Sequence, residues 1–132
     1  MNRLNKMLIF FAGFLLLLSC GEQESESLKQ AKLDARQKID QAILEIDEEL
    51  ENMQEKIEFM EGYAKDVVKE RQQYLEQVRE QLDQRADSLE IIKEKEWENY
   101  QHTIELKIQQ MEDSLITWTD TDKEIPEPPV YP

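Results

Sequence analysis

Apolar residues recur every three or four positions from Leu28 to Trp118, which is the spacing of one face of an α-helix. At 100° per residue these positions fall within an arc about 140° wide. The stripe consists of Leu28, Ala31, Ala35, Ile39, Ala42, Ile46, Leu50, Met53, Ile57, Met60, Ala64, Val67, Leu75, Val78, Leu82, Ala86, Leu89, Trp97, Tyr100, Ile104, Ile108, Met111, Leu115 and Trp118. Arg71 and Lys93 occupy the remaining stripe positions, where long aliphatic stems can cover apolar surface. The pattern predicts an all-α fold.

Many stripe positions recur at intervals of eleven, as Leu28, Ile39 and Leu50 do. An eleven-residue repeat averages about 3.67 residues per turn, which is typical of a nearly straight or slightly right-handed supercoil. The repeat shifts by one residue near Met60 to Gly62. This shift indicates either a local adjustment of one helix or a bend.

We expect a single long amphipathic helix, similar to a coiled coil, over residues 27–118. The stripe keeps its phase through Gly62, and no cluster of Gly, Pro, Asn or Asp precedes Asp120 to mark a tight turn. Such a helix would be about 135 Å long. A helical hairpin or a small bundle is the alternative, since a second apolar flank suits more than two packed helices. That flank consists of Phe59, Tyr63, Tyr74, Ile92 and Leu106.

Two boundaries delimit the helical region. Ser27 and Gln30 have the spacing of a capping box, which predicts the helix start at Ser27. Residues 119–132 contain four prolines among the last seven residues, so this segment is expected to be a disordered tail or an extended docking motif.

The first twenty residues have the organisation of a secretory signal. Arg3 and Lys6 precede an apolar run over residues 7–18, which is too short to span a bilayer as a helix. The run ends in Leu17-Leu18-Ser19-Cys20, which resembles the lipobox of bacterial lipoproteins. The resemblance implies a signal peptide over residues 1–19, cleavage before Cys20 and acylation of Cys20. Residues 20–26 would then form the lipidated cysteine and a polar tether.

The mature chain is strongly acidic, with 14 basic against 30 acidic residues and a net charge of −16. Such a surface repels nucleic acid and anionic headgroups. Residue 21 is glycine, whereas the enteric sorting rule uses aspartate there to retain lipoproteins at the inner membrane. We therefore expect a lipid-anchored protein of the cell envelope, at the outer membrane on its periplasmic or surface side.

Residues capable of chemistry are isolated from suitable partners. His102 is the one histidine and is expected on the surface, while the carboxylates of residues 45–51 lack the glycine and ligand spacing of a calcium loop. Trp97, Tyr100 and Trp118 have the spacing of core residues rather than of a ligand platform. We therefore expect no enzyme activity, cofactor, metal or small-molecule substrate.

The apolar stripe needs a partner surface, because a solvated apolar face forfeits the burial that stabilises most helices. That surface could come from another copy, another part of this chain or a different protein. The plan of a lipobox followed by an amphipathic helix is similar to that of the small murein lipoproteins, although the terminal lysine that bonds to peptidoglycan in that family is replaced here by Pro132. The expected function is a non-enzymatic structural or spacer role through helix–helix association. The alternative is an accessory module that binds one envelope or host protein through its stripe or proline tail.

Overall fold

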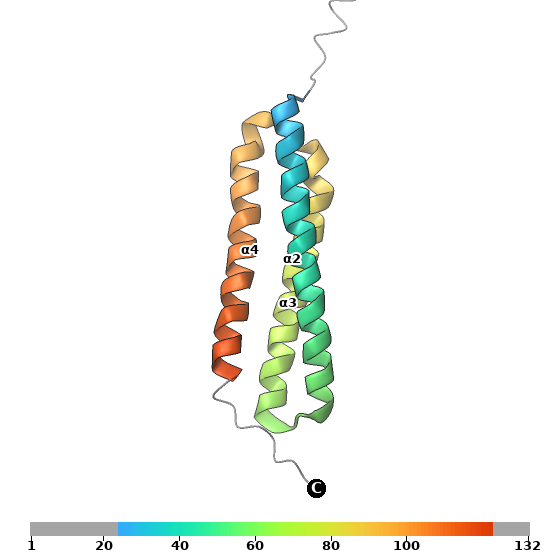
Figure 1. Cartoon of the computed structure of the whole chain (residues 1–132), viewed down its shortest axis with the longest axis vertical. Helices are drawn as coiled ribbons and strands as arrows, with labels where there is room; N and C mark the ends of the chain where they lie inside the picture. The colour runs from blue at the N-terminus through green and yellow to red at the C-terminus, as the bar shows by residue number, and fades with distance from the viewer. Residues whose placement is uncertain (1–23, 123–132) are drawn as a thin grey trace, which may run out of the picture.

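A computed structural model describes residues 24–122, which form three antiparallel α-helices (Figure 1). Helix α2 covers Glu26–Phe59, α3 covers Gly62–Ser88 and α4 covers Glu94–Asp122, with one 3-10 turn, η1, at Leu89–Ile91. The predicted all-α fold is confirmed. Of the single long helix, the hairpin and the small bundle, the structure is the small bundle. The predicted signal peptide, Cys20 and residues 123–132 lie outside the described residues.

The first turn shows that a single continuous helix over residues 27–118 is wrong. Helix α2 ends at Phe59, and Met60 and Glu61 adopt extended backbone conformations. Gly62 then has a φ of +68°, a left-handed conformation that glycine adopts without the steric cost of a Cβ atom. The one-residue shift of the apolar repeat therefore marks a reversal of the chain.

The second turn uses no glycine or proline. The chain tightens into η1, and Ile92 becomes extended before α4 begins at Glu94. The Ile92 N–H donates to the Leu89 carbonyl at 3.4 Å, and the Glu96 N–H donates to the Lys93 carbonyl at 2.9 Å. Ile92 packs against the core, whereas Lys93, a predicted stripe position, is exposed.

The helical region also begins and ends slightly outside its predicted limits. Ser25 caps α2 rather than Ser27, because the Ser25 hydroxyl accepts a hydrogen bond from the Leu28 N–H at 3.1 Å. At the other end, α4 continues to Asp122, so residues 119–122 belong to this helix and not to the predicted tail.

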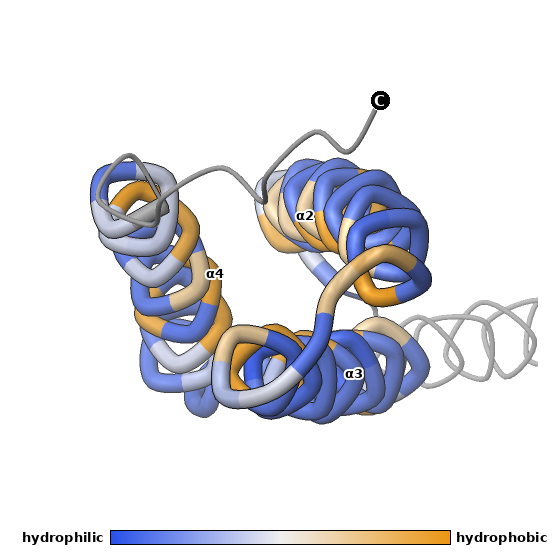
Figure 2. The backbone as a smooth tube through the Cα atoms, turned by 90° about the horizontal axis from the view of Figure 1, so that it is seen from below, coloured by the Kyte–Doolittle hydropathy of each residue, from blue (hydrophilic) through white to orange (hydrophobic). Residues whose placement is uncertain are grey.

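The core lies where the stripes of the three helices face one another (Figure 2). Its buried apolar residues are Leu28, Ala35, Ile39, Ala42, Ile46, Met53, Ile57, Val68, Leu75, Val78, Leu82, Ala86, Leu89, Trp97, Ile104 and Met111. All except Val68 are stripe positions. The stripe predicts its neighbour Val67, which is half-buried in the structure. Tyr74 and Ile92 of the second flank contact the core, while Phe59, Tyr63 and Leu106 are exposed.

Candidate functional site

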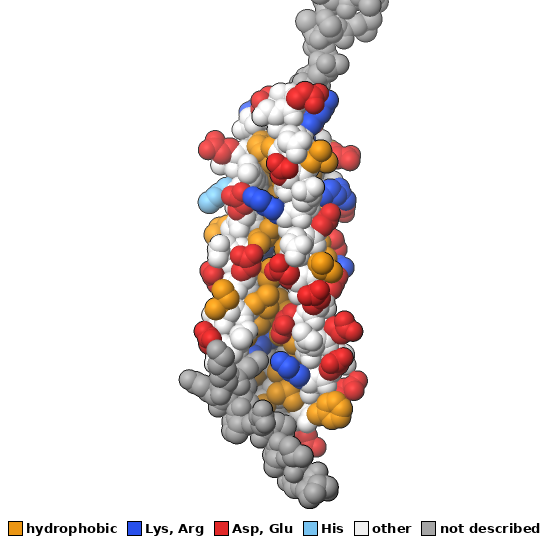
Figure 3. Space-filling view, viewed as in Figure 1, with side chains coloured by type: hydrophobic (Ala, Val, Ile, Leu, Met, Phe, Trp, Pro, Cys, Tyr) orange, Lys and Arg blue, Asp and Glu red, His pale blue; other side chains and the backbone are white. Residues whose placement is uncertain are grey.

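A groove with a volume of about 680 Å³ lies between α2 and α4. Helices α2 and α3 contact each other closely, whereas α4 contacts both of them less extensively. In the space-filling view, apolar side chains are visible between the helices at the base of this face (Figure 3). The groove combines residues of two helices around an apolar base, and it is the candidate binding site.

The base of the groove is made of small residues on one side. Ala31, Ala35 and Ala42 come from α2, and Ile104 comes from α4. Ala35, Ala42 and Ile104 are buried and Ala31 is half-buried. Because an alanine side chain extends by a single methyl group, α2 does not fill the space toward α4.

The walls of the groove are polar and predominantly acidic. Glutamines and charged residues from both helices line them, with four carboxylates and one lysine. The wall residues are Asp34, Gln37, Lys38, Gln41 and Glu45 from α2 and Gln101, Glu105 and Glu112 from α4. An apolar base between acidic walls suits an amphipathic helix with basic residues beside its apolar face.

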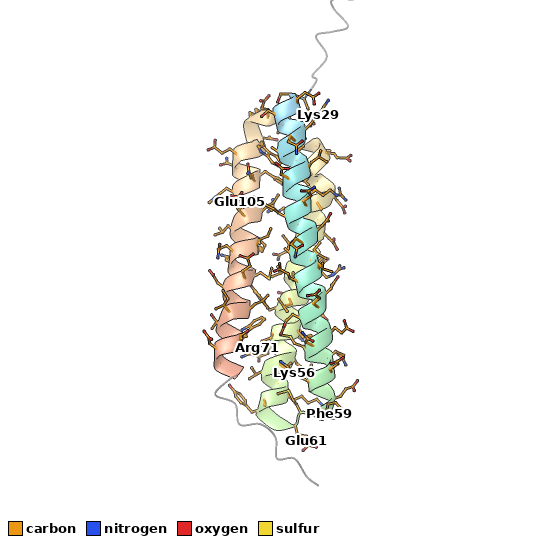
Figure 4. All side chains as sticks on the ribbon, viewed as in Figure 1. Lys29, Lys56, Phe59, Glu61, Arg71 and Glu105 are labelled. Carbon is orange, nitrogen blue, oxygen red and sulfur yellow. The ribbon has the colours of Figure 1, made fainter. Side chains whose placement is uncertain are left out.

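One ion pair bridges the two walls. Glu105 projects from α4 (Figure 4), where its Oε1 accepts a hydrogen bond from the Lys38 ammonium at 3.2 Å and another from the Gln101 amide at 3.3 Å. These hydrogen bonds, led by that from Lys38, lower the pKa of Glu105 below its ordinary value. Both charged side chains are about half exposed, so the pair can exchange partners with an incoming cation.

Specific contacts close the interface between α2 and α3. The Arg79 guanidinium donates to both carboxylate oxygens of Asp47, at 2.6 and 3.3 Å, and to Asp83 at 2.9 Å. The hydrogen bond to Asp47 raises the pKa of Arg79 above its ordinary value. Gln72 also donates across the interface to Gln54 at 3.1 Å.

Aromatic residues close the interface between α3 and α4. Trp118 stands edge-on to Tyr74 with ring centroids 5.7 Å apart, and the Arg71 guanidinium lies 5.3 Å from the Trp118 ring. The Tyr100 hydroxyl donates to the Arg85 carbonyl at 2.7 Å. Trp97, Tyr100 and Trp118 all contact the core, in agreement with their predicted packing role. The groove lies on the other side of α4, between α4 and α2.

The structure places the other candidate residues apart. His102 is exposed, as predicted. Within residues 24–122, no group of three or more His, Cys, Asp or Glu side chains is placed to hold a metal ion. No helix in this same part of the chain is both long enough and apolar enough to cross a membrane. The groove itself was not predicted; its sequence signal is the alanines at positions 31, 35 and 42 within the stripe.

Comparisons with protein-family models, with curated proteins and with solved structures gave no match.

Proposed function

We propose that this protein is a lipid-anchored, non-enzymatic lipoprotein of the cell envelope that works through helix–helix association. The Cys20 motif supports the anchor. The α2–α4 groove is the observation that carries the mode of action, since its alanine-rich base leaves room between these two helices. The bundle binds an amphipathic helix of another envelope or host protein in this groove.

Charge selects the occupant. The groove walls carry four carboxylates and one lysine, so a helix with Lys or Arg beside its apolar face is complementary to them. A second copy of this chain is a poorer match, because the mature chain has a net charge of −16 and two copies would repel each other. The apolar stripes already cover one another within the bundle, so the chain needs no second copy to bury them.

A spacer role is the second candidate. The helices form a block about 50 Å long, judged from the 34 residues of α2, and the anchor would hold one end of that block at the membrane. This role needs no occupant in the groove.

The anchor is tested by mass spectrometry of the protein purified from the membrane fraction of the producing cells. The amino-terminal tryptic peptide, residues 20–29, should begin at Cys20 and carry acyl chains. Cys20→Ser, which has no thiol to acylate, should yield no acylated peptide. An unacylated peptide, or a chain that retains residues 1–19, would overturn the proposed anchor.

The groove is tested by photo-crosslinking in intact cells from an artificial amino acid placed at Gln41, in the groove, or at Gln73, an exposed glutamine of α3. Position 41 should crosslink to a helix of another protein that has basic residues beside its apolar face, and position 73 should not. Ala31→Phe, which fills the groove, should abolish the crosslink, and Ala64→Phe at the half-buried start of α3 should preserve it.

The alternative outcomes are distinct. A crosslink from position 41 to a second copy of this chain would replace the foreign helix with self-association. Equal labelling from positions 41 and 73, or no product from either, would overturn the groove as a binding site and leave the spacer role.

A further inference from the structure

The turn between α3 and α4 is held against the beginning of α2. The Lys32 ammonium donates to the Glu90 carbonyl at 3.3 Å and forms an ion pair with Glu24. The Ser25 hydroxyl lies 3.5 Å from the Glu94 carboxylate. These contacts place the turn at the end of the bundle where the chain enters it.

The chain length before α2 limits how far this end can lie from Cys20. Five peptide units connect Cys20 to Ser25, and a fully extended chain of that length spans at most about 18 Å. The headgroup layer on each side of a bilayer is about 5–8 Å thick. An acylated Cys20 would therefore hold this end of the bundle at or within reach of the headgroups.

The same end carries an exposed isoleucine. Ile91 is 76% exposed although its neighbour Ile92 packs against the core. Ile91, Ile92 and Leu28 line a depression of about 520 Å³ together with two lysines and three carboxylates, which are Lys93, Lys95, Glu24, Glu90 and Glu94. Lysines next to an exposed apolar side chain suit the boundary between lipid and water, where an aliphatic stem lies among acyl chains and its ammonium group reaches the phosphates.

The two ends of the bundle also differ in charge. Residues 24–32 and 89–96, at the α3–α4 turn, contain five carboxylates and four lysines. Residues 55–66 and 116–122, at the opposite end, contain six carboxylates and two lysines. The end nearest Cys20 is close to neutral in an otherwise acidic chain, so it meets less repulsion from anionic headgroups.

We propose that the α3–α4 turn is a membrane-contact site, in which Ile91 inserts into the lipid surface that holds Cys20. The proposal rests on the acylation of Cys20 proposed above. It gives the bundle a fixed orientation, with α3 and α4 joined at the lipid and the α2–α3 turn directed away from it.

The test uses full-length acylated protein in vesicles of phosphatidylethanolamine and phosphatidylglycerol. Ile91→Cys is labelled with a nitroxide, and Phe59→Cys is the matched control, because Phe59 is 80% exposed and lies at the opposite end of the bundle (Figure 4). Cys20 is the one native cysteine, and acylation blocks its sulfur, so the introduced thiol is the labelled one. Electron paramagnetic resonance then compares collisions of the label with oxygen, which partitions into lipid, and with a water-soluble nickel chelate.

The label at position 91 should have an oxygen-to-nickel collision ratio several-fold higher than the label at position 59. Equal ratios in protein whose Cys20 is shown by mass spectrometry to be acylated would overturn the membrane contact while leaving the anchor intact. Nitroxide labelling of the unsubstituted protein would instead reveal a free Cys20 thiol, and that result would overturn the proposed anchor and the membrane contact together.

Discussion

Helix α2 has two neighbours and meets them differently. Toward α3 it presents Asp47, which pairs with Arg79, and Ile43 and Leu50 lie one turn before and one turn after Asp47 on the same flank. Toward α4 it presents Ala31, Ala35 and Ala42 at the base of the groove. The size of the side chains on the two flanks of one helix thus decides that one interface closes and the other stays open.

The largest difference between the two interfaces is expected in the unfolding free energies of variants in which a core side chain is truncated to alanine. Leu82→Ala, within α3 and fully buried, should lower the free energy of unfolding by about 3–5 kcal/mol. Ile104→Ala should cost about 2–3 kcal/mol, because the space it leaves joins the groove and water can enter it. Urea unfolding of a chain of residues 21–132, which lacks the apolar run and Cys20, measures both values, and a larger loss for Ile104→Ala would contradict the comparison.

Enlarging an alanine should destabilise the closed part of the core more than the groove. Ala86→Leu, in α3 and outside the groove, should cost about 1–3 kcal/mol through overpacking. Ala35→Leu should change stability by less than about 0.5 kcal/mol or increase it, because the groove offers space for the added atoms. The two alanines are equally buried at 5% exposure, which makes them matched controls in the same unfolding experiment. Equal losses at both positions would mean that the groove is too narrow for an added side chain.

Removing a polar contact should also cost more stability at the α2–α3 interface than at the α2–α4 groove, although both losses are smaller than those in the core. Arg79→Met should lower the free energy of unfolding by about 1 kcal/mol, because one guanidinium holds Asp47 with two hydrogen bonds and Asp83 with a third. Lys38→Met should cost less than about 0.5 kcal/mol, since its pair with Glu105 is single and half exposed. Double-mutant cycles with Asp47→Asn and Glu105→Gln measure the two coupling energies, and an equal coupling would remove this difference between the interfaces.

The smallest expected effect depends on pH. The pKa of Glu105 is lower in the folded protein than in the unfolded chain, so ionised Glu105 stabilises the fold above the unfolded pKa, and that stabilisation is lost as the pH falls through the folded pKa. The half-exposed carboxylate should contribute less than about 0.5 kcal/mol. The difference in unfolding free energy between the unsubstituted chain and Glu105→Gln should therefore shrink below about pH 4. If this difference in unfolding free energy grew on acidification, the folded-state pKa of Glu105 would be raised and not lowered.

The stripe predicted the fold class and most of the core, because each helix of a bundle buries one face with the same period. For the same reason it could not predict the turns. The apolar residues before and after Gly62 share nearly one phase whether the chain continues or reverses, and the turn at Ile92 and Lys93 uses residues that occur equally well inside helices. The flank residues Tyr74 and Ile92 were the better indication of a bundle, since both contact the core.

The groove was harder to predict than the core. It depends on how far α4 stands from α2, and helical periodicity fixes directions around an axis but not distances between axes. Ala35 and Ala42 count as apolar in the pattern, as isoleucine would. The pattern therefore carries no information on the small side-chain volume that leaves the space open.

An odd number of antiparallel helices places the two ends of the bundle's chain far apart. Helix α4 ends beside the α2–α3 turn (Figure 1), so Lys123 follows from a point about 44 Å along α4 from its start at Glu94. A hairpin or a four-helix bundle would return the end of its last helix to the end at which the chain enters. With three helices, and with the anchor proposed above, the end of α4 would lie on the aqueous side, so access to it would not depend on the crowding of headgroups around Cys20.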